Sequence, residues 1–280
     1  MNRTMITAAN TMGQLQKQLD VISNNIANSQ TTGYKKRTAQ FSELMYQQFN
    51  NQPVRGDAVG RLTPAGIRQG VGAQLSQIQM IMNLGSIVQT NRMLDFAIRD
   101  EKQFFKVLVE RDGESTIQYT RNGAFYLSPL NDEETMLVNG DGHPILDENN
   151  NSIIFSGNMK TVGLADQGTL VFTNDANEEQ TFQLGIVQIE KPQLLELAGD
   201  SMLKLPNHFD ELTLPVEEIV MELNGAERGE INIAHQALEQ SNVDVAEEMT
   251  NLIQTQRSYQ FQARSITLAD QMQGLINGIR

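Results

Sequence analysis

Residues 5–28 have the sequence MITAANTMGQLQKQLDVISNNIAN. Apolar side chains recur here at alternating spacings of three and four residues, at Met5, Ala8, Met12, Leu15, Leu19, Ile22 and Ile26. This is the a/d pattern of a coiled-coil helix sustained over about three heptads. Turn-forming residues from Asn28 to Gly33 follow it. The pattern therefore predicts one long helix from about residue 2 to residue 28.

The C-terminal end carries a second amphipathic pattern. Asp244 with Glu247 has the spacing of a capping box, and no proline occurs after Pro215, so a helix from 245 to about 277 is predicted. Its apolar positions are Val245, Met249, Leu252, Tyr259, Ala263, Ile266, Ala269, Met272, Ile276 and Ile279, with Gln256 in the gap. A helix with so narrow a stripe is not stable alone. We expect the terminal helices to pair as a coiled coil.

The middle of the chain has the texture of strands and turns. Predicted strands are Phe104–Val109, Ile117–Arg121, Phe125–Leu127, Met136–Val138, Ile145–Leu146, Ile153–Phe155, Thr169–Phe172 and Phe182–Ile189. Asn122-Gly123 predicts a hairpin turn. Short strands without a helical pattern among them favour a sandwich, a barrel or an irregular β-domain.

These patterns predict an α+β fold with paired terminal helices and a central, mainly-β domain. Residues 49–84 contain Pro53, Pro64 and several glycines, which is typical of an extended connector or a long hairpin. The expected segments are an N-terminal helix and assembly segment at 1–48, the connector at 49–84, the β-domain at 85–231 and the C-terminal helix at 232–280.

The net charge of −13 is unevenly distributed. It is +5 over residues 1–100, −16 over 101–230 and −2 over 231–280. An acidic middle argues against nucleic acid as a partner, since phosphate binding needs clustered Lys and Arg. The short cluster Lys35-Lys36-Arg37 is interpreted as a solvated turn. No run reaches the ~20 apolar residues of a membrane span, and the first residues do not form a cleavable signal sequence.

Residues that could carry chemistry are scarce. The chain has no cysteine, which excludes disulfides, thiolate metal sites and thiol nucleophiles. His143, His208 and His235 have no second histidine or carboxylate at metal-ligand spacing. No phosphate-binding loop, dinucleotide fingerprint or nucleophile elbow occurs. We therefore expect no cofactor, no metal and no enzymatic activity.

Four ordered motifs resemble the bacterial flagellar rod and hook protein family. They are SNNIAN with TTGYK at 23–35, LDFAI at 94–98, YTRNGAF at 119–125, and LEQSNVDV with QRSY between 238 and 259. The matching terminal residues are Asn24, Asn25, Asn28, Thr32, Gly33, Tyr34, Ser241, Asn242, Val243, Asp244, Gln256 and Arg257. One departure follows Ile98, where Asp100–Gln103 stand in place of the family's usual Gly-x-Gly.

The resemblance implies a structural role. Members of this family form the tubular rod and hook, with the terminal helices inside the tube and the β-domain outside. The length is typical of a distal-rod-type subunit or a close rod–hook relative. Implied partners are copies of this chain, other rod and hook proteins, and the flagellar type III export apparatus. The implied location is the flagellar basal body. Phe41 to Met45 resembles an export motif, and a plain amphipathic turn is the alternative.

Two other function classes remain open on the residues. A soluble coiled-coil adaptor or export regulator of the flagellar system would use similar helices. An enzyme such as a cell-wall hydrolase would need an acid, base or nucleophile cluster in the β-domain, and none is recognisable in the sequence.

Overall fold

A computed structural model describes the chain over residues 3–45, 47–49, 67–70, 72–111, 113–131, 134–157, 159–175, 177–199, 201–206 and 215–278. Residues 50–66 and 71, which are half of the expected connector at 49–84, lie outside the described residues, as do His208 and Ile279. The chain forms two compact units. Unit 1 comprises Met1–Ile26, Arg37–Gln79 and Val245–Arg280, and unit 2 comprises Ala27–Lys36 and Met80–Asp244. The fold is α+β, with terminal helices and a central β-domain, as predicted.

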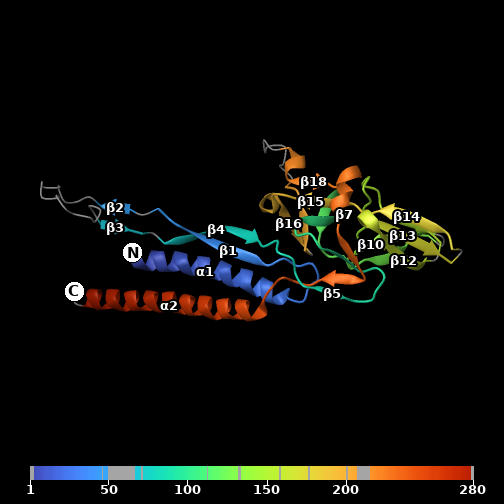
Figure 1. Cartoon of the computed structure of the whole chain (residues 1–280). Coiled ribbons are helices and arrows are strands. Elements are labelled where there is room, and N and C mark those ends of the chain that lie inside the picture. Colours follow the sequence, from blue (N-terminus) through green and yellow to red (C-terminus); the bar gives the residue numbers. More distant parts are fainter. Residues whose placement is uncertain are drawn as a thin grey trace, which may run out of the picture. The chain divides into compact units, whose positions relative to one another are not determined.

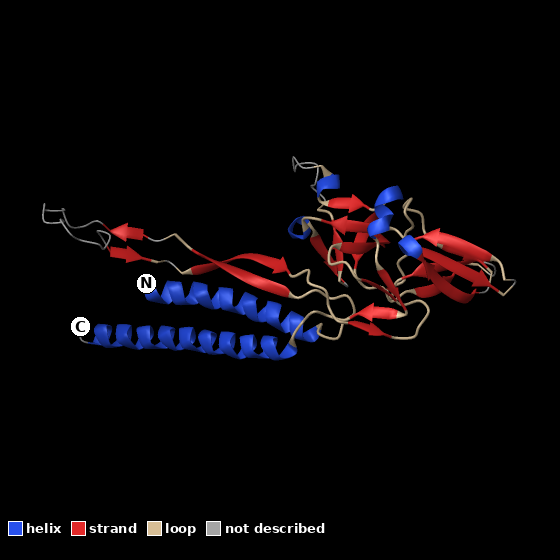
Figure 2. Cartoon of the chain, in the orientation of Figure 1, coloured by secondary structure: helices blue, strands red, loops and turns tan. Residues whose placement is uncertain are grey.

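Unit 1 contains the two long helices, α1 (Arg3–Ala27) and α2 (Val245–Gly278), whose extents match the prediction. Between them in sequence lie two pairs of strands, β1 (Arg37–Glu43) with β4 (Ala73–Met80) and β2 (Gln47–Phe49) with β3 (Ile67–Gln69). Figures 1 and 2 show β1 and β4 as a twisted ribbon beside α1. The Leu75 amide of β4 donates to Gln14 Oε1 of α1 at 3.0 Å, so the ribbon covers one side of this helix.

Unit 2 is built from antiparallel sheets. The largest has the order β16-β17-β8-β7-β15-β18, and two three-stranded sheets have the orders β11-β10-β9 and β12-β13-β14. Two short pairs, β20 with β5 and β19 with β6, attach the last strands. The bounds are β5 Ile87–Gln89, β6 Phe96–Ile98, β7 Gln103–Arg111, β8 Glu114–Thr120, β9 Tyr126–Pro129, β10 Glu134–Val138, β11 Ile154–Ser156, β12 Met159–Ala165, β13 Thr169–Asn174, β14 Glu179–Gln183, β15 Ile186–Ile189, β16 Glu196–Gly199, β17 Met202–Lys204, β18 Val220–Glu222, β19 Ile233–His235 and β20 Ala237–Glu239.

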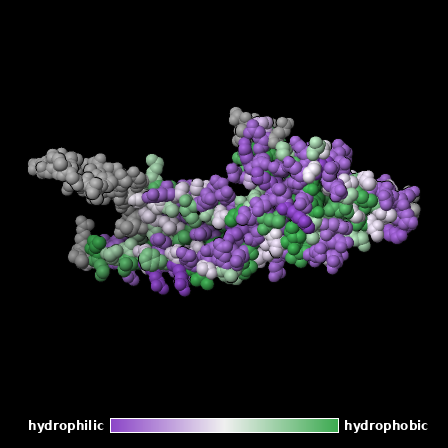
Figure 3. All heavy atoms as spheres, in the orientation of Figure 1, coloured by the Kyte–Doolittle hydropathy of each residue, from purple (hydrophilic) through white to green (hydrophobic). Residues whose placement is uncertain are grey.

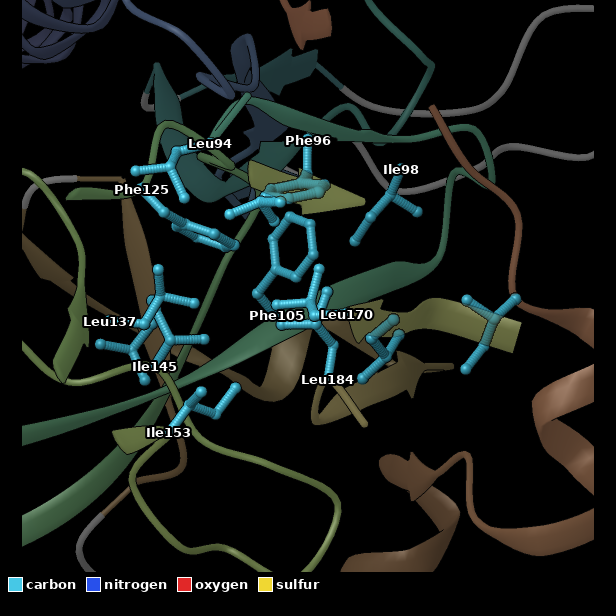
Figure 4. Close-up of a cluster of buried hydrophobic side chains, with 14 of the residues drawn as sticks. Leu94, Phe96, Ile98, Phe105, Phe125, Leu137, Ile145, Ile153, Leu170 and Leu184 are labelled. Atoms are coloured by element: carbon cyan, nitrogen blue, oxygen red, sulfur yellow. The ribbon is translucent and has the colours of Figure 1, made fainter. Parts of the chain in front are cut away.

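The core of unit 2 lies where these sheets face one another. Figure 4 shows its large side chains, which come from β6, β7, β10, β13 and the segments between strands. Phe125 is central, because its ring lies 5.7 Å from that of Phe96 and 5.1 Å from that of Phe105. All three rings are fully buried. Burial of this much apolar surface is the main term that stabilises unit 2.

The predicted hairpin at Asn122-Gly123 is wrong. Strand β8, which precedes it, pairs with β7 and β17, while β9, which follows it, pairs with β10. The dipeptide instead crosses from one sheet to another. A Cβ on Gly123 would lie 1.8 Å from the Phe96 carbonyl oxygen, so the glycine is needed for close backbone approach rather than for a tight turn.

The single strand predicted at Phe182–Ile189 is two strands, β14 and β15, in different sheets. The break falls at Leu184 and Gly185. A Cβ on Gly185 would lie 2.4 Å from the Asp147 carbonyl oxygen, and the Gly185 amide donates to Leu146 O at 2.9 Å. Close packing against a neighbouring loop therefore interrupts a run that is continuous in hydropathy.

Candidate assembly site

The Asn25 side chain ties the elements of unit 1 together. Its amide nitrogen donates to the Arg37 carbonyl oxygen at 2.8 Å and to Glu248 Oε2 of α2 at 3.0 Å. Its amide oxygen accepts from the Arg37 amide at 3.0 Å. Asn25 is 1% exposed and Glu248 is 2% exposed. One buried amide therefore joins α1, the start of β1 and the first turn of α2, which explains why an asparagine is used at this position.

Asn24 and Asn28 of the N-terminal motif both make local hydrogen bonds. The Asn24 side chain donates to the Asp20 carbonyl oxygen at 2.7 Å on the exposed side of α1. Asn28 comes directly after the helix, and its carbonyl oxygen accepts from the Thr31 amide at 3.2 Å. The helix therefore ends at the turn residues that the sequence indicated.

The predicted seam of α1 is the covered side of that helix. Ala8 and Ile22 are buried, and the remaining seam residues are partly buried: Met5, Met12, Leu15, Leu19 and Ile26. The ribbon contacts other residues of α1. Val21 of α1 and Leu75 and Ile78 of β4 line one cavity of about 250 Å³, and the Leu75 amide donates to Gln14. These contacts of the ribbon therefore lie beside the predicted seam of α1.

The seam predicted on α2 fits less well. Leu252, Tyr259 and Ile266 are partly buried, whereas Val245 is 42% exposed and Met249 is 45% exposed. The buried positions of α2 are Glu248, Thr255 and Ala269. Gln256 and Arg257 are exposed. Burial in the single chain therefore follows one side of α2 that only partly coincides with the predicted seam.

A second apolar surface on α2 combines Met272 and Ile276 of the predicted pattern with three residues that the sequence reasoning missed. We call it the α2 stripe, and it consists of Phe261 (70% exposed), Leu268 (58%), Met272 (50%), Leu275 (69%) and Ile276 (68%). Its members recur at helical spacing, so they share one side of the helix. Figure 3 shows hydrophobic residues gathered toward the C-terminal end of α2. The seven-residue spacing of Phe261, Leu268 and Leu275 was the signal that could have revealed it.

The predicted solvated turn at Lys35-Lys36 is wrong, because both side chains are buried. Lys35 Nζ lies 2.7 Å from Glu239 Oε1 and donates to the carbonyl oxygens of Met82 and Asn83 at 3.1 and 2.8 Å. Glu239 Oε2 accepts from Arg121 Nε at 2.8 Å. We call Lys35, Arg121 and Glu239 the Glu239 cluster. Burial and the nearby Arg121 guanidinium lower the pKa of the Lys35 ammonium.

Asn242 of the C-terminal motif organises the neighbouring backbone in unit 2. Its side chain donates to the carbonyl oxygens of Ile81 and Asn83 at 3.0 and 2.9 Å, and accepts from the Lys36 amide at 2.6 Å. Ser241 accepts from the Val243 amide at 3.4 Å. Three segments far apart in sequence, at 36, 81–83 and 242, are thereby fixed to one another.

The N-terminal and central motifs also meet in unit 2. Thr32 Oγ1 donates to Asn122 Oδ1 at 2.9 Å, and the Gly33 amide donates to the Glu239 carbonyl oxygen at 2.9 Å. Gly33 has a φ of +70°, and a Cβ there would lie 2.6 Å from the Asn122 nitrogen. Tyr34 is buried. These motif residues therefore build a packed junction, a role that their sequence spacing did not indicate.

The departure from the family's usual glycines has a local substitute. The Asp100 side chain accepts from the Lys102 amide at 2.8 Å, which closes the turn that leads into β7. Phe41 lies on strand β1 and is 40% exposed, and Met45 follows it and is 89% exposed. Phe41 is thus part of a strand, so the amphipathic-turn interpretation of this segment is wrong.

No catalytic or metal centre stands out in the described part of the chain. Within those residues, no three His, Asp or Glu side chains are grouped to hold a metal ion. His235 Nε2 lies 2.9 Å from the Met93 carbonyl oxygen, and the His143 amide donates to Asn139 Oδ1. None of the helices in the same residues is long and apolar enough to cross a membrane.

Comparison with known proteins gives a consistent family. Residues 5–35 match the family described as "Flagella basal body rod protein", and residues 234–279 match "Flagellar basal body rod FlgEFG protein C-terminal". The chain is 43% identical over 284 residues to the flagellar hook-basal body complex protein FlhP of Bacillus subtilis, with both chains fully covered.

Two further relatives are flagellar basal-body rod proteins FlgG. That of Borreliella burgdorferi is 32% identical over 282 residues, covering 100% of this chain and 99% of its own length. That of Agrobacterium fabrum is 32% identical over 275 residues, covering 98% of each chain. The similarity spans both helices and the β-domain. This chain belongs to the flagellar basal-body rod protein family.

Proposed function

We propose that this chain is a structural subunit of the bacterial flagellar basal body, in the distal rod or the rod–hook region. Its partners are copies of itself and other rod and hook proteins, and it acts without enzymatic chemistry or a cofactor. The observation that carries the proposal is the α2 stripe on a helix whose other side is already covered. Contiguous exposed apolar surfaces of this kind are typical of protein–protein interfaces.

Assembly into a tube follows from where the stripe lies. A stripe on one helix that packs against a different surface of the next copy makes a heterologous contact, and repeated heterologous contacts build helical filaments. In this proposal segments 1–48 and 232–280 form the coiled-coil layer of the assembly, with the predicted seams shared between copies. Val245 and Met249, which are exposed in the single chain, are then covered by a neighbouring subunit in the assembly. The acidic segment 85–231 forms the outer surface.

Electron microscopy of the purified full chain tests this proposal. We expect tubular assemblies for the unmodified chain and none for the double variant Leu268→Ser/Leu275→Ser. The matched control is Leu197→Ser, which replaces a 41% exposed leucine on β16 of unit 2 and should still assemble. Tubes from the double variant, or a monomer of the unmodified chain at every concentration, would contradict the proposal. The second outcome would favour a coiled-coil adaptor instead.

Export through the flagellar type III apparatus is the second part of the proposal. Phe41 and Met45 lie close together in sequence and both are exposed, so an export component has access to them. We expect Phe41→Ala/Met45→Ala to reduce secretion of the chain at least tenfold in a flagellated host. Ile78→Ala, at a 48% exposed position on β4, is the control and should be secreted normally. Normal secretion of the double variant would remove the export role from this segment.

A further inference from the structure

The Glu239 cluster contains two cations and one carboxylate, all buried. The side chains of Lys35, Arg121 and Glu239 are 3%, 1% and 1% exposed. Arg121 directly follows β8, and Glu239 ends β20, so each is positioned by a strand of unit 2. Lys35 belongs to residues 28–36, a segment without helix or strand that we call the strap.

Arg121 is held by more than the carboxylate. Its guanidinium donates to Gln103 O at 2.7 Å and Ile98 O at 3.3 Å, and also to the Asp100 carbonyl oxygen. Glu239 in turn accepts from the Gly85 amide at 2.9 Å. The Arg121–Glu239 pair therefore has balanced charge and several hydrogen bonds within unit 2 before Lys35 is considered.

Removal of Lys35 and removal of Glu239 therefore have unequal consequences. Without Lys35, one guanidinium still neutralises one carboxylate. Without Glu239, two cations face each other in a buried site, which is strongly unfavourable. Lys35 is the surplus charge of the cluster, and its pKa is lowered by burial and by Arg121, so burying this ammonium carries a cost.

We propose that the strap is a detachable element that docks onto a preformed Arg121–Glu239 pair, with Lys35 as its latch. The strap makes further contacts, among them the hydrogen bond from Thr32 Oγ1 to Asn122 Oδ1 at 2.9 Å. The Gly33 amide donates to Glu239 O at 2.9 Å, the Ile81 amide donates to Lys36 O at 2.8 Å, and the Lys36 amide donates to Asn242 Oδ1. None of them is a rung of the β7–β8 or β7–β15 ladders that enclose the core. The strap can leave without opening those ladders.

The proposal also implies an order of folding within the chain. The strap directly follows α1 in sequence, and its release leaves the β-domain folded. Docking of the strap is then a separate, later step than folding of the sheets. The inference does not depend on whether the assembled form is a tube or an adaptor complex.

Hydrogen exchange of the full chain, read by mass spectrometry, tests the proposal. Peptides from the strap report the Gly33 and Lys36 amides. Peptides from the core report the Leu108 and Ile145 amides, which donate to Pro144 O and Leu137 O. Lys35→Met keeps the aliphatic stem and removes the charge. We expect it to speed exchange in the strap at least tenfold, with core exchange and the urea midpoint of unit 2 unchanged.

Two further variants complete the test. Glu239→Gln should speed exchange in both strap and core, because it leaves two buried cations. Lys102→Met removes the cation of the exposed Lys102–Glu190 pair and should change neither. The proposal fails if Lys35→Met lowers the urea midpoint as much as Glu239→Gln does. It also fails if strap exchange in Lys35→Met remains at the rate of the unmodified chain, or if strap and core open together.

Discussion

Units 1 and 2 satisfy their apolar residues in opposite ways. In unit 2 the large side chains of Figure 4 meet each other across sheets and are sealed from water. In unit 1 the helices are covered on one side, and the α2 stripe is left open. A closed core stabilises a domain alone, whereas an exposed stripe is stabilising only once another surface covers it. Unit 2 is therefore closed within one chain, whereas in the proposed assembly a neighbouring subunit covers the open surface of unit 1.

Replacing one phenylalanine in each unit measures how much a closed and an open apolar site contribute to the free energy of unfolding. Phe105→Ala empties a fully buried site in unit 2 and should lower the free energy of unfolding of that unit by about 3–5 kcal/mol, since a cavity adds to the lost burial. Phe261→Ala removes the same ring from a 70% exposed position of unit 1, where surface substitutions change stability by about 0.5 kcal/mol or less.

Urea unfolding of the dilute full chain compares the two variants. Hydrogen exchange at the Leu108 and Ile145 amides follows unit 2, and far-ultraviolet circular dichroism follows the helices. A Phe105→Ala chain as stable as the unmodified one would mean that the core is not closed. A large loss of stability in the Phe261→Ala monomer would mean that the α2 stripe is already covered within one chain.

The elements that the sequence predicted are those set by local pattern. The bounds of α1 and α2 follow from heptad spacing, the turn residues after Ala27 and the absence of proline in the last helix. The strands of the core, such as β7 and β13, follow from runs of β-branched and aromatic residues. These features depend on neighbours in sequence, so one sequence is enough to find them.

The features that were missed depend on residues far apart. Lys35 has the local sequence of a solvated turn, and its burial depends on partners far away in sequence, among them Glu239, 204 positions away. Asn122-Gly123 has the composition of a hairpin turn, but Phe96 approaches Gly123 so closely that the glycine serves packing. The sequence predicted one apolar surface on α2, where the structure has two. Helix periodicity also could not predict that the ribbon of β1 and β4 packs against α1.

Alkaline pH tests the closed interior of unit 2 at a single residue, and the expected change in stability is smaller than that of Phe105→Ala. Tyr119 of β8 packs in a second apolar cluster with Phe104, Val187 and Leu203. Burial, with a smaller contribution from Glu222, raises the pKa of its hydroxyl to about 12. The unfolded chain has the ordinary value of about 10. The folded state thus keeps its proton where the unfolded state loses it, and stability falls as pH rises between these values.

Tyr119→Phe removes this titration. We expect the unmodified chain to lose about 1 kcal/mol of unfolding free energy relative to the variant when the pH rises from 8 to 11, one pH unit above the unfolded pKa. Lys35 also titrates at alkaline pH with the opposite sign, but both chains contain it, so its contribution cancels in the difference. Urea unfolding at the two pH values measures the effect. Equal pH dependence in the two chains would show that the Tyr119 hydroxyl reaches solvent, and that unit 2 is less closed at β8 than its burial indicates.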